Sequence, residues 1–292
     1  MPIQQTVKLN TGAEMPVLGL GTWKSAPGEV ELAVEFALKN GYKHIDTATA
    51  YANEAEVGKG IKASGVPRES FFLTTKLANN DHTRVEAALA YSLKQLDTDY
   101  LDLWLMHWPA PMLEDYSGAA KSIDWLDTWK SMVKLHKAQP EKVRAIGVSN
   151  MVPEYLERLL ANSEVIPATN QIESHPSCPQ EDIIEFCRSK GIIVTAYSPL
   201  GSNNSPLLAN PVVTTLAEKY KVEPSNILIS LQANKPGVTV IPKSVTNTRI
   251  ATNLKVVELT SEEIQQLQDI GKTSPFRVCD ASWTGWGSIG FK

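Results

Sequence analysis

Cysteine is scarce in this sequence. The 292 residues include only three, Cys178, Cys187 and Cys279. An odd and sparse set argues against a disulfide framework and is typical of a reducing compartment, so we expect a cytoplasmic protein. His175 stands close to Cys178, but no second pair of ligands follows at a spacing suited to a metal. The sequence therefore predicts neither disulfides nor a bound metal.

Long apolar runs and clusters of positive charge are also missing. No stretch approaches the roughly 20 apolar residues that span a bilayer. The opening, MPIQQTVKLN, lacks the basic region and apolar core of a signal peptide. Lysine and arginine form no long run, and the formal net charge is −4 with a pI near 5.8. Membranes and nucleic acids are therefore not expected partners, whereas an anionic small ligand needs only a local positive pocket.

Apolar, β-branched runs alternate along the chain with segments of helical periodicity. PGEVELAVEFALKN has Pro27 near its start and Gly41 just past its end, the usual placement at the two ends of a helix. Further helices are expected over 81–96, 123–138, 152–162, 180–191 and 211–220. Strands are expected at 16–21, 42–46, 71–76, 100–108, 143–149, 167–172, 192–198 and 237–242.

This alternation of strands and helices predicts the fold class. Continuous apolar strands covered by helices favour a parallel sheet buried on both faces. Eight such units predict an α/β protein with one closed (β/α)8 barrel, formed by residues 1–292 as a single domain. A doubly wound open sheet is the alternative, and its nucleotide-binding form carries G-x-G-x-x-G after the first strand. The stretch found there, GLGTWKSAPG, lacks the third glycine at its place and favours the barrel.

Two segments lie outside the repeating unit. VKLNTGAEMP is typical of a hairpin with its turn at Asn10–Gly12, and in a barrel it would close the bottom. The tail SPFRVCDASWTGWGSIGFK is rich in glycine and tryptophan and has no helical period. We expect the tail to form a loop over the active site.

Four polar residues stand at or just after predicted strand ends. Asp46 ends the second strand, Tyr51 follows it, Lys76 ends the third and His107 ends the fourth. Taken singly, each has an ordinary explanation as a helix cap, rim packing, a solvated strand end or a buried structural histidine. In a barrel, however, the carboxyl ends of all strands meet at one mouth, where active sites lie. We therefore expect the four side chains to meet there.

The chemistry of these four residue types suits proton delivery to a carbonyl oxygen. A free tyrosine has a pKa of about 10 and donates its proton reluctantly near neutral pH. A neighbouring ammonium favours the phenolate, and a shift of roughly three units is worth about 4 kcal/mol. We therefore expect Lys76 to lower the pKa of Tyr51, and Asp46 to keep Lys76 charged. His107 would hydrogen-bond the substrate oxygen.

Motifs along nearly the whole chain resemble those of the aldo-keto reductase family, in order and at the family's spacing. They are GLGTW, GYKHIDTATAYANEAEVGKGI, TTKL, LMHWP, AIGVSN, NQIESHP, AYSPLGS and IPKSVTNTRIATN. The likeness is greatest to fungal and yeast-type members that reduce aldehydes and ketones or oxidise glycerol-like alcohols. It implies a monomeric, NADPH-dependent barrel enzyme acting on a small carbonyl substrate. The implied catalytic tetrad is Asp46, Tyr51, Lys76 and His107.

A polar and basic cluster follows the last predicted strand. It consists of Lys243, Ser244, Thr246, Arg249 and Asn253, at a place where barrels often hold phosphate. A lysine, two hydroxyls and an arginine suit a phosphate monoester, although an ordinary basic helix start is the alternative. The resemblance assigns this cluster to the 2′-phosphate and adenine end of NADPH.

The resemblance also implies the remaining cofactor contacts. Ser149, Asn150 and Gln171 would hydrogen-bond the carboxamide of the nicotinamide, and Tyr197 would stack on its ring. In the implied mechanism, hydride passes to the carbonyl carbon while Tyr51 protonates the oxygen. The other expected contacts are Gly21, Thr22, Trp23, Asp46, Ser198, Leu200, Ser202 and Val245.

Aromatic residues are candidates for the wall of the substrate pocket. With Tyr51 and His107, we expect Trp23, Trp108, Trp283 and Trp286 to form a pocket for apolar or aromatic carbonyls, although the tail tryptophans also suit packing at the rim.

Three departures from the family pattern affect the predicted sites. Ala78 stands where many relatives have tryptophan, and the loop from Pro109 to Asp124 is shorter than in many members. Both predict a wide mouth that accepts bulky ketones or ketoesters. Thr252 stands where relatives commonly carry an acid that contacts adenine.

Two other functions stay open at this level. One is an NADP-dependent dehydrogenase that oxidises glycerol or other polyols. The other is a non-enzymatic nucleotide-binding protein on the same fold. The intact set of four polar residues favours an enzyme, because a purely structural use would not need them.

Overall fold

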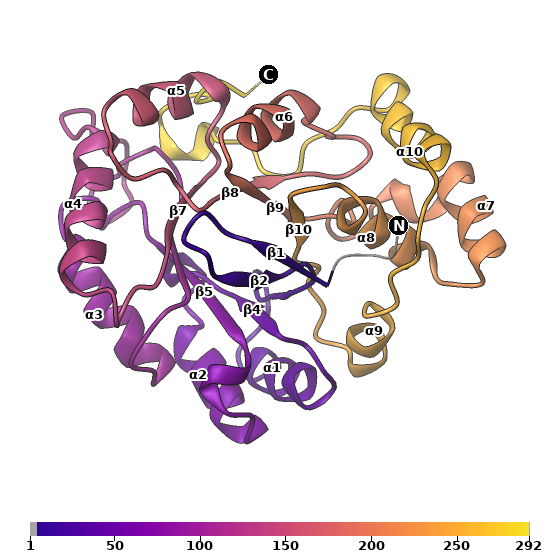
Figure 1. The fold of residues 1–292 in the computed structure, drawn as a ribbon, viewed down its shortest axis with the longest axis horizontal. Helices are drawn as coiled ribbons and strands as arrows, with labels where there is room; N and C mark the ends of the chain where they lie inside the picture. Colours follow the sequence, from indigo (N-terminus) through magenta and orange to yellow (C-terminus); the bar gives the residue numbers. More distant parts are fainter. Residues whose placement is uncertain (1–4, 292) are drawn as a thin grey trace.

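Eight parallel strands form the centre of the computed structural model, which describes residues 5–291 (Figure 1). They pair in chain order, and bridges from Leu18 to Val240 and from Gly21 to Lys243 join the first strand to the last. The predicted (β/α)8 barrel is confirmed. The strands are β3 (Leu20–Gly21), β4 (His44–Asp46), β5 (Phe72–Leu77), β6 (Leu103–Met106), β7 (Ile146–Ser149), β8 (Thr169–Glu173), β9 (Ile193–Tyr197) and β10 (Val238–Val240).

Helices surround this barrel (Figure 1). They are α1 (Glu29–Lys39), α2 (Glu54–Ser64), α3 (Val85–Leu96), α4 (Trp125–Ala138), α5 (Pro153–Ala161), α6 (Glu181–Ser189), α7 (Pro211–Tyr220), α8 (Pro224–Ala233), α9 (Asn247–Thr252) and α10 (Ser261–Thr273). The predicted helices are found, but α8 and α10 were not expected. Residues 226–233 of α8 are all buried, so this helix has no one-sided apolar stripe. The start of α10 carries a capping box between Thr260 and Glu263, a signal readable in the sequence.

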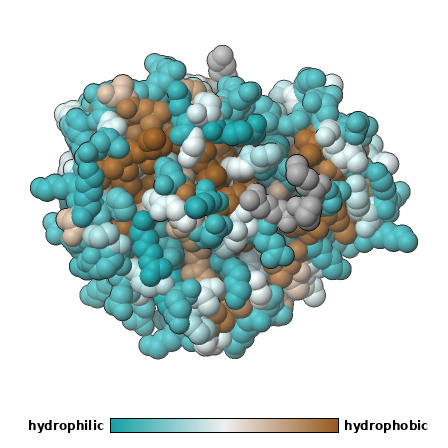
Figure 2. Space-filling model, in the orientation of Figure 1, coloured by the Kyte–Doolittle hydropathy of each residue, from teal (hydrophilic) through white to brown (hydrophobic). Residues whose placement is uncertain are grey.

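The predicted hairpin closes one end of the barrel. It pairs β1 (Thr6–Lys8) with β2 (Glu14–Pro16), and it crosses the strands at the front of Figure 1. The amide of Asn10 donates to the carbonyls of Ile166 and Pro167, which precede β8. The hairpin therefore covers the amino ends of the strands. On this face, apolar residues appear in separate patches with hydrophilic side chains between them (Figure 2).

Close helix packing fixes the segment that carries Tyr51. Helices α1 and α2 cross at Gly60, where an added Cβ would lie 2.5 Å from the carbonyl oxygen of Glu31. Only glycine permits that approach. The 3₁₀ turn η1 (Thr49–Tyr51) leads almost directly into α2. The tight crossing thus holds the place of Tyr51 at the end of β4.

The tail lies at the carboxyl ends of the strands, opposite the hairpin. Ala281 and Ile289 pack with Trp108 and Ala110, which follow β6. The indole N–H of Trp286 donates to the carbonyl of Pro111 at 2.7 Å. The expected loop over this mouth is confirmed. No helix among residues 5–291 is both long enough and apolar enough to cross a membrane.

Candidate active site

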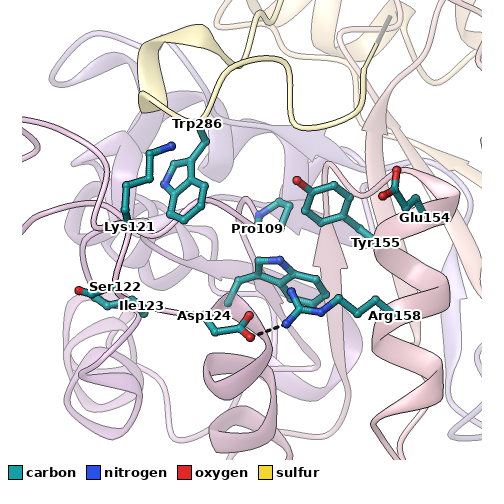
Figure 3. A pocket seen from close by; sticks show the side chains of 10 residues that line it. Pro109, Lys121, Ser122, Ile123, Asp124, Glu154, Tyr155, Arg158 and Trp286 are labelled. Carbon is teal, nitrogen blue, oxygen red and sulfur yellow. Dashed lines mark hydrogen bonds and ion pairs between the residues drawn. The ribbon is translucent and has the colours of Figure 1, made fainter.

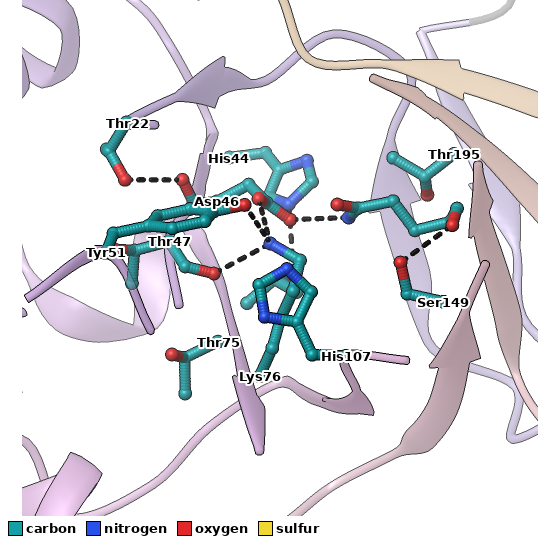
Figure 4. Close-up of polar contacts among 12 residues, drawn as sticks. Thr22, His44, Asp46, Thr47, Tyr51, Thr75, Lys76, His107, Ser149 and Thr195 are labelled. Carbon is teal, nitrogen blue, oxygen red and sulfur yellow. Dashed lines mark hydrogen bonds and ion pairs between the residues drawn. The ribbon is translucent and has the colours of Figure 1, made fainter. Parts of the chain in front are cut away.

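The four predicted catalytic residues meet at the mouth of the barrel (Figure 4). The ammonium of Lys76 donates to Oδ1 of Asp46 at 2.5 Å and lies 3.3 Å from the hydroxyl of Tyr51. The ring centroids of Tyr51 and His107 are 5.6 Å apart, edge to face. Three neighbouring strands and the turn after the first of them thus build one cluster, as the barrel geometry predicted.

Local structure sets the direction of each of these side chains. Asp46 ends β4, Lys76 lies within β5 and His107 directly follows β6, so neighbouring strands supply three of the four. Tyr51 comes from the turn η1 rather than from an irregular loop, and Ala52 then takes a left-handed conformation with φ of 55°. This reversal separates η1 from α2 and aims the phenol back at the strand ends.

The ion pair between Lys76 and Asp46 is fully enclosed. Their side chains are 0% and 2% exposed. Two further hydrogen bonds satisfy the pair, one from the ammonium to the carbonyl of Thr47 at 2.8 Å and one from Gln171 to Oδ2 of Asp46 at 2.7 Å. Such additional bonds are what a buried pair needs to offset the cost of desolvation.

The predicted lowering of the Tyr51 pKa is wrong for this structure. Burial raises the pKa of Tyr51 well above its ordinary value, and the negative charge of Asp46 raises it further. Asp46 lies closer to the Lys76 ammonium than the phenol does, so its charge largely offsets the effect of Lys76 on Tyr51. Burial also lowers the pKa of Lys76, while Asp46 opposes that shift.

His107 is held as a neutral imidazole. Burial lowers its pKa well below the ordinary value, and the nearby Lys76 charge adds to the effect. Its Nδ1 is buried without a hydrogen-bond partner. Asn150 fixes the backbone here by donating to the carbonyl of His107 at 2.9 Å. A neutral, partly unsatisfied imidazole beside a phenol is suited to hold a carbonyl oxygen by hydrogen bonding.

The residues expected at the nicotinamide form one connected network. Asn150 donates to the Ser149 hydroxyl at 3.0 Å, and the hydroxyl of Tyr197 donates to Asn150 at 2.9 Å. Ser149 in turn donates to the carbonyl of Gln171, whose side chain reaches Asp46. The network links the tetrad to the ring of Tyr197, and its amide groups keep hydrogen-bonding capacity for a planar carboxamide. These residues fit the nicotinamide end of the cofactor.

Gly21 ends β3, where it closes the barrel against the segment after β10, and Thr22 follows it. A Cβ at Gly21 would lie 2.9 Å from the carbonyl oxygen of Ile241, so the close approach of strands demands glycine there. Thr22 is buried, and its hydroxyl donates to the carbonyl of Asp46 at 3.1 Å. Trp23 is partly exposed, with the Lys24 ammonium 4.3 Å from its ring centre. Trp23 is therefore the member of this run that solvent reaches.

Two serines after β9 occur in a tightly turning loop. Ser198 and Ser202 are both left-handed, with φ of 50° and 67°. Leu200, between them, packs against the apolar cores on both sides. A loop that turns in this way can present backbone N–H groups to an anion, as a pyrophosphate site requires.

The cluster after β10 fits a phosphate group. Thr246 and Arg249 are exposed and Lys243 is half-buried, all around the start of α9. The Lys243 ammonium donates to the carbonyl of Lys24 at 3.0 Å. Within residues 5–291, neither Lys243 nor Arg249 forms a salt bridge, although the charge of Glu29 acts on Lys243, so both cations keep donors for an anion. Three neighbours lie beside them: Ser244 accepts from the Thr246 amide, the partly buried Val245 packs on the core and Asn253 is buried.

Thr252, at the position where relatives commonly carry an acid, is partly exposed at the end of α9 and makes a local hydrogen bond. Its hydroxyl donates to the carbonyl of Thr248 at 2.7 Å, within the same helix. A threonine hydroxyl carries no charge, and the loss of the adenine contact expected of an acid at this position stays a prediction.

Comparison with known proteins shows the family of the chain. A protein-family model, described as aldo/keto reductase family, matches residues 17–272 of the sequence. The chain belongs to the aldo/keto reductase family. Similar proteins include glycerol 2-dehydrogenase (NADP(+)) of Saccharomyces cerevisiae, 45% identical, and an aldehyde reductase of the same organism, 44% identical; each alignment covers 95% of both chains. A Bombyx mori aldo-keto reductase solved in complex with NADP is 38% identical with a TM-score of 0.88, covering 97% of this chain and 98% of its own.

In this aldo/keto reductase, the two tail tryptophans predicted to line the substrate pocket lie in different surroundings. Trp283 is 53% exposed and meets Trp108 edge to face, with ring centroids 6.2 Å apart. Trp286 instead faces a cavity of about 520 Å³ beside α4 and α5, opposite Tyr155 (Figure 3). The ammonium of Lys121 lies 4.0 Å from the centre of the Trp286 ring. Trp108 and Trp283 therefore remain as a pair at the mouth. Trp286 instead contacts Pro111 and Lys121 in the loop after β6.

The expected widening at Ala78 is not found. Ala78 is 2% exposed, because the loop after β6 covers it; Met112 donates to the carbonyl of the next residue, Asn79, at 2.8 Å. The space of a missing tryptophan is thus closed rather than open to solvent.

Two contributors to the site were missed from the sequence of this aldo/keto reductase. Thr47 takes part through its backbone carbonyl, which leaves no signal in the residue type. Glu173 is a buried carboxylate at the end of β8, two residues after Gln171. Because side chains alternate along a strand, residues 171 and 173 share one face, and that spacing could have identified Glu173.

Proposed function

We propose that this aldo/keto reductase reduces aldehydes and ketones to alcohols with NADPH. The observation that carries the proposal is the buried Lys76 ammonium, shared between Asp46 at 2.5 Å and the Tyr51 hydroxyl at 3.3 Å. The Bombyx mori relative was solved in complex with NADP, and the yeast relatives are named for NADP(+) and for aldehyde reduction. These similarities support the choice of cofactor and reaction.

In the proposed mechanism, NADPH bound at this site would supply the hydride for the carbonyl carbon. The neutral imidazole of His107 and the hydroxyl of Tyr51 hold the carbonyl oxygen between them. Tyr51 gives its proton to this oxygen as negative charge develops there. An alkoxide is a much stronger base than a phenolate, so the transfer is downhill even with the raised pKa of Tyr51.

Lys76 acts after the proton has moved. The phenolate left on Tyr51 lies beside the Lys76 ammonium, which stabilises it in a site with little water. Asp46 keeps Lys76 charged against the effect of burial. In the reverse direction, the same phenolate would accept the proton of an alcohol.

We place the cofactor along the residues that fit it. Ser149, Asn150, Gln171 and Tyr197 would hold the nicotinamide. Ser198 to Ser202 would follow the pyrophosphate, and Lys243 with Arg249 would bind the 2′-phosphate. The two cations and the amide network described above support this orientation.

The Tyr51→Phe variant tests the role of the phenol. We expect turnover of an aromatic aldehyde, followed by the loss of NADPH absorbance, to fall by roughly 10²–10⁴-fold, the usual contribution of a positioned acid. NADPH affinity should stay within about twofold, because the hydroxyl is not needed to hold the nucleotide. Tyr91→Phe, at a half-exposed helix position, is the matched control. Turnover by Tyr51→Phe within a few-fold of the unchanged protein would contradict the assignment.

Substrates with apolar or aromatic groups suit the mouth formed by Trp108 and Trp283. The covered Ala78 does not support an enlarged pocket, so ketoesters are the informative members of a carbonyl panel. Oxidation of glycerol-like alcohols is the second candidate, supported by the name of one yeast relative. Initial rates in both directions near neutral pH distinguish the two.

We also infer a cytoplasmic monomer in which residues 1–292 form one domain, with no nucleic acid or membrane as partner. The free thiols of all three cysteines and the acidic net charge support this setting. Analytical ultracentrifugation should give a single species near 32.0 kDa.

A further inference from the structure

Glu173 is a buried carboxylate that the catalytic mechanism does not use. Its side chain is 0% exposed at the end of β8. Oε1 accepts from the backbone N–H of Val278 at 2.7 Å and lies 2.8 Å from Nε2 of His175. Oε2 accepts from the backbone N–H of Cys279 at 2.7 Å. Both oxygens are therefore occupied, and two of the three partners are successive amides of the tail.

The tail segment that Glu173 holds has no regular secondary structure of its own. Residues 274–281 contain no helix or strand, and the 3₁₀ turn η4 (Ser282–Thr284) follows. The Phe276 amide donates to the carbonyl of Ser177 at 3.1 Å, and its ring lies 4.8 Å from the ring of His175. Arg277 reaches the side chain of Gln180 at 3.2 Å. Glu173 thus supplies the charged anchor of an otherwise irregular chain.

The anchored amides lie beside residues assigned to the cofactor and the substrate. Glu173 is paired in register with Tyr197 on β9, and the side chains of Cys279 and Tyr197 are within hydrogen-bonding reach. A few residues further along, Trp283 meets Trp108 at the mouth. A shift of Val278 and Cys279 would therefore move the wall that faces the substrate.

We propose that Glu173 is a positioning residue that clasps the tail at Val278 and Cys279 and so sets the substrate wall at Trp283. The inference rests on the proposed function, because that function places the substrate at this mouth. Glu173 touches neither substrate nor cofactor in this assignment. It acts through the tail alone.

The chemistry of the clasp requires a carboxylate. Burial alone would raise the pKa of Glu173, but the hydrogen bonds from His175 and the two amides outweigh it and keep the pKa below the ordinary value. A carboxylate only accepts hydrogen bonds, and charge makes each bond stronger. A glutamine of the same shape carries an N–H₂ group on one side, so at least one of the tail amides would lose its acceptor.

The first test uses the unchanged protein without any substrate. Hydrogen exchange followed by mass spectrometry should show slow exchange at the amides of Val278 and Cys279, and fast exchange at the solvent-exposed amides around Gly287. Exchange of the two clasped amides at the rate of an unstructured peptide would overturn the proposal.

The second test compares Glu173→Gln and Glu173→Asp with the unchanged protein. Trypsin cleaves after Arg277, at the bond whose N–H Glu173 holds, so release of the fragment 278–292 reports opening of the clasp. We expect release to quicken in the order unchanged, Asp, Gln. The Asp variant keeps the charge and the accepting oxygens, and its comparison with the unchanged protein suffices if the Gln variant does not fold. Glu164→Gln, on the exposed surface, is the control.

Kinetics separate positioning from a general loss of structure. In Glu173→Gln, the KM for an aromatic ketone should rise about tenfold, which corresponds to about 1.4 kcal/mol. The kcat for the same ketone and the Kd for NADPH should stay within about twofold. Equal falls in kcat and NADPH affinity, or an unchanged KM together with unchanged cleavage at Arg277, would overturn the proposal. Failure of the proposed function would appear instead as an unchanged protein that turns over no carbonyl, while both clasp tests still succeed.

Discussion

Replacing Lys76 by methionine tests the buried charge network on which the site depends. Methionine replaces the unbranched stem of the side chain but leaves Asp46 buried, 2% exposed, without its ammonium. Removing one partner of a buried ion pair costs about 3–5 kcal/mol. For a chain of 292 residues the unfolding entropy is roughly 0.6 kcal/mol/K, so the Tm should fall by about 5–8 °C. Differential scanning calorimetry at one scan rate measures this difference.

Two further variants decide whether the loss comes from the unpaired charge. Lys39→Met removes an exposed i,i+4 ion pair with Glu35 and should lower the Tm by less than about 1 °C. The double variant Asp46→Asn/Lys76→Met has no buried charge at this position and should recover most of the stability, although not the activity. A Tm of Lys76→Met within about 1 °C of the unchanged protein would refute the reasoning.

Three other perturbations test separate parts of the structure. Arg249→Ala should weaken NADPH binding about 10–100-fold, the value of a charge-assisted hydrogen bond, and leave NADH binding unchanged in a fluorescence titration; equal losses for both nucleotides would contradict the phosphate assignment. Burial lowers the pKa of His82 to about 4, so stability that is fully present above pH 6.5 is lost as the pH falls toward 4, about 3 kcal/mol in all. His82→Gln should make the Tm profile less steep over that range, with a slope that remains because burial also lowers the pKa of His44 to about 4; an unchanged slope would disprove the contribution of His82. Gly60→Ala should cost about 1–3 kcal/mol because its Cβ would meet the Glu31 carbonyl, whereas Gly118→Ala, with open space around it, should be near neutral in thermal melts.

Much of the fold was readable because its strands and amphipathic helices have clear periods. The failures have identifiable causes. Helix α8 is buried on nearly all sides, so its apolar residues show no stripe. Helix α10 begins with a capping box at Thr260 and Glu263, a signal that lies outside the apolar periodicity.

The sequence predicted which residues form the candidate site, but not how their charges and pKa values are set. Residue order placed Asp46, Tyr51, Lys76 and His107 at strand ends, and the barrel brought them together. The sign of the Tyr51 pKa shift was not predictable, because it depends on burial and on which neighbour the ammonium approaches most closely. Those quantities are distances in the fold and have no counterpart in residue spacing.

The two ends of the described chain leave the barrel at opposite faces. Strand β1 lies over the amino ends of the strands, whereas residues 281–289 pack around Trp108 at the catalytic mouth. An affinity tag or a surface linker joined ahead of the hairpin would therefore sit away from the path of the substrate. The same addition after the tail would obstruct the mouth of the barrel, where substrate and nucleotide enter.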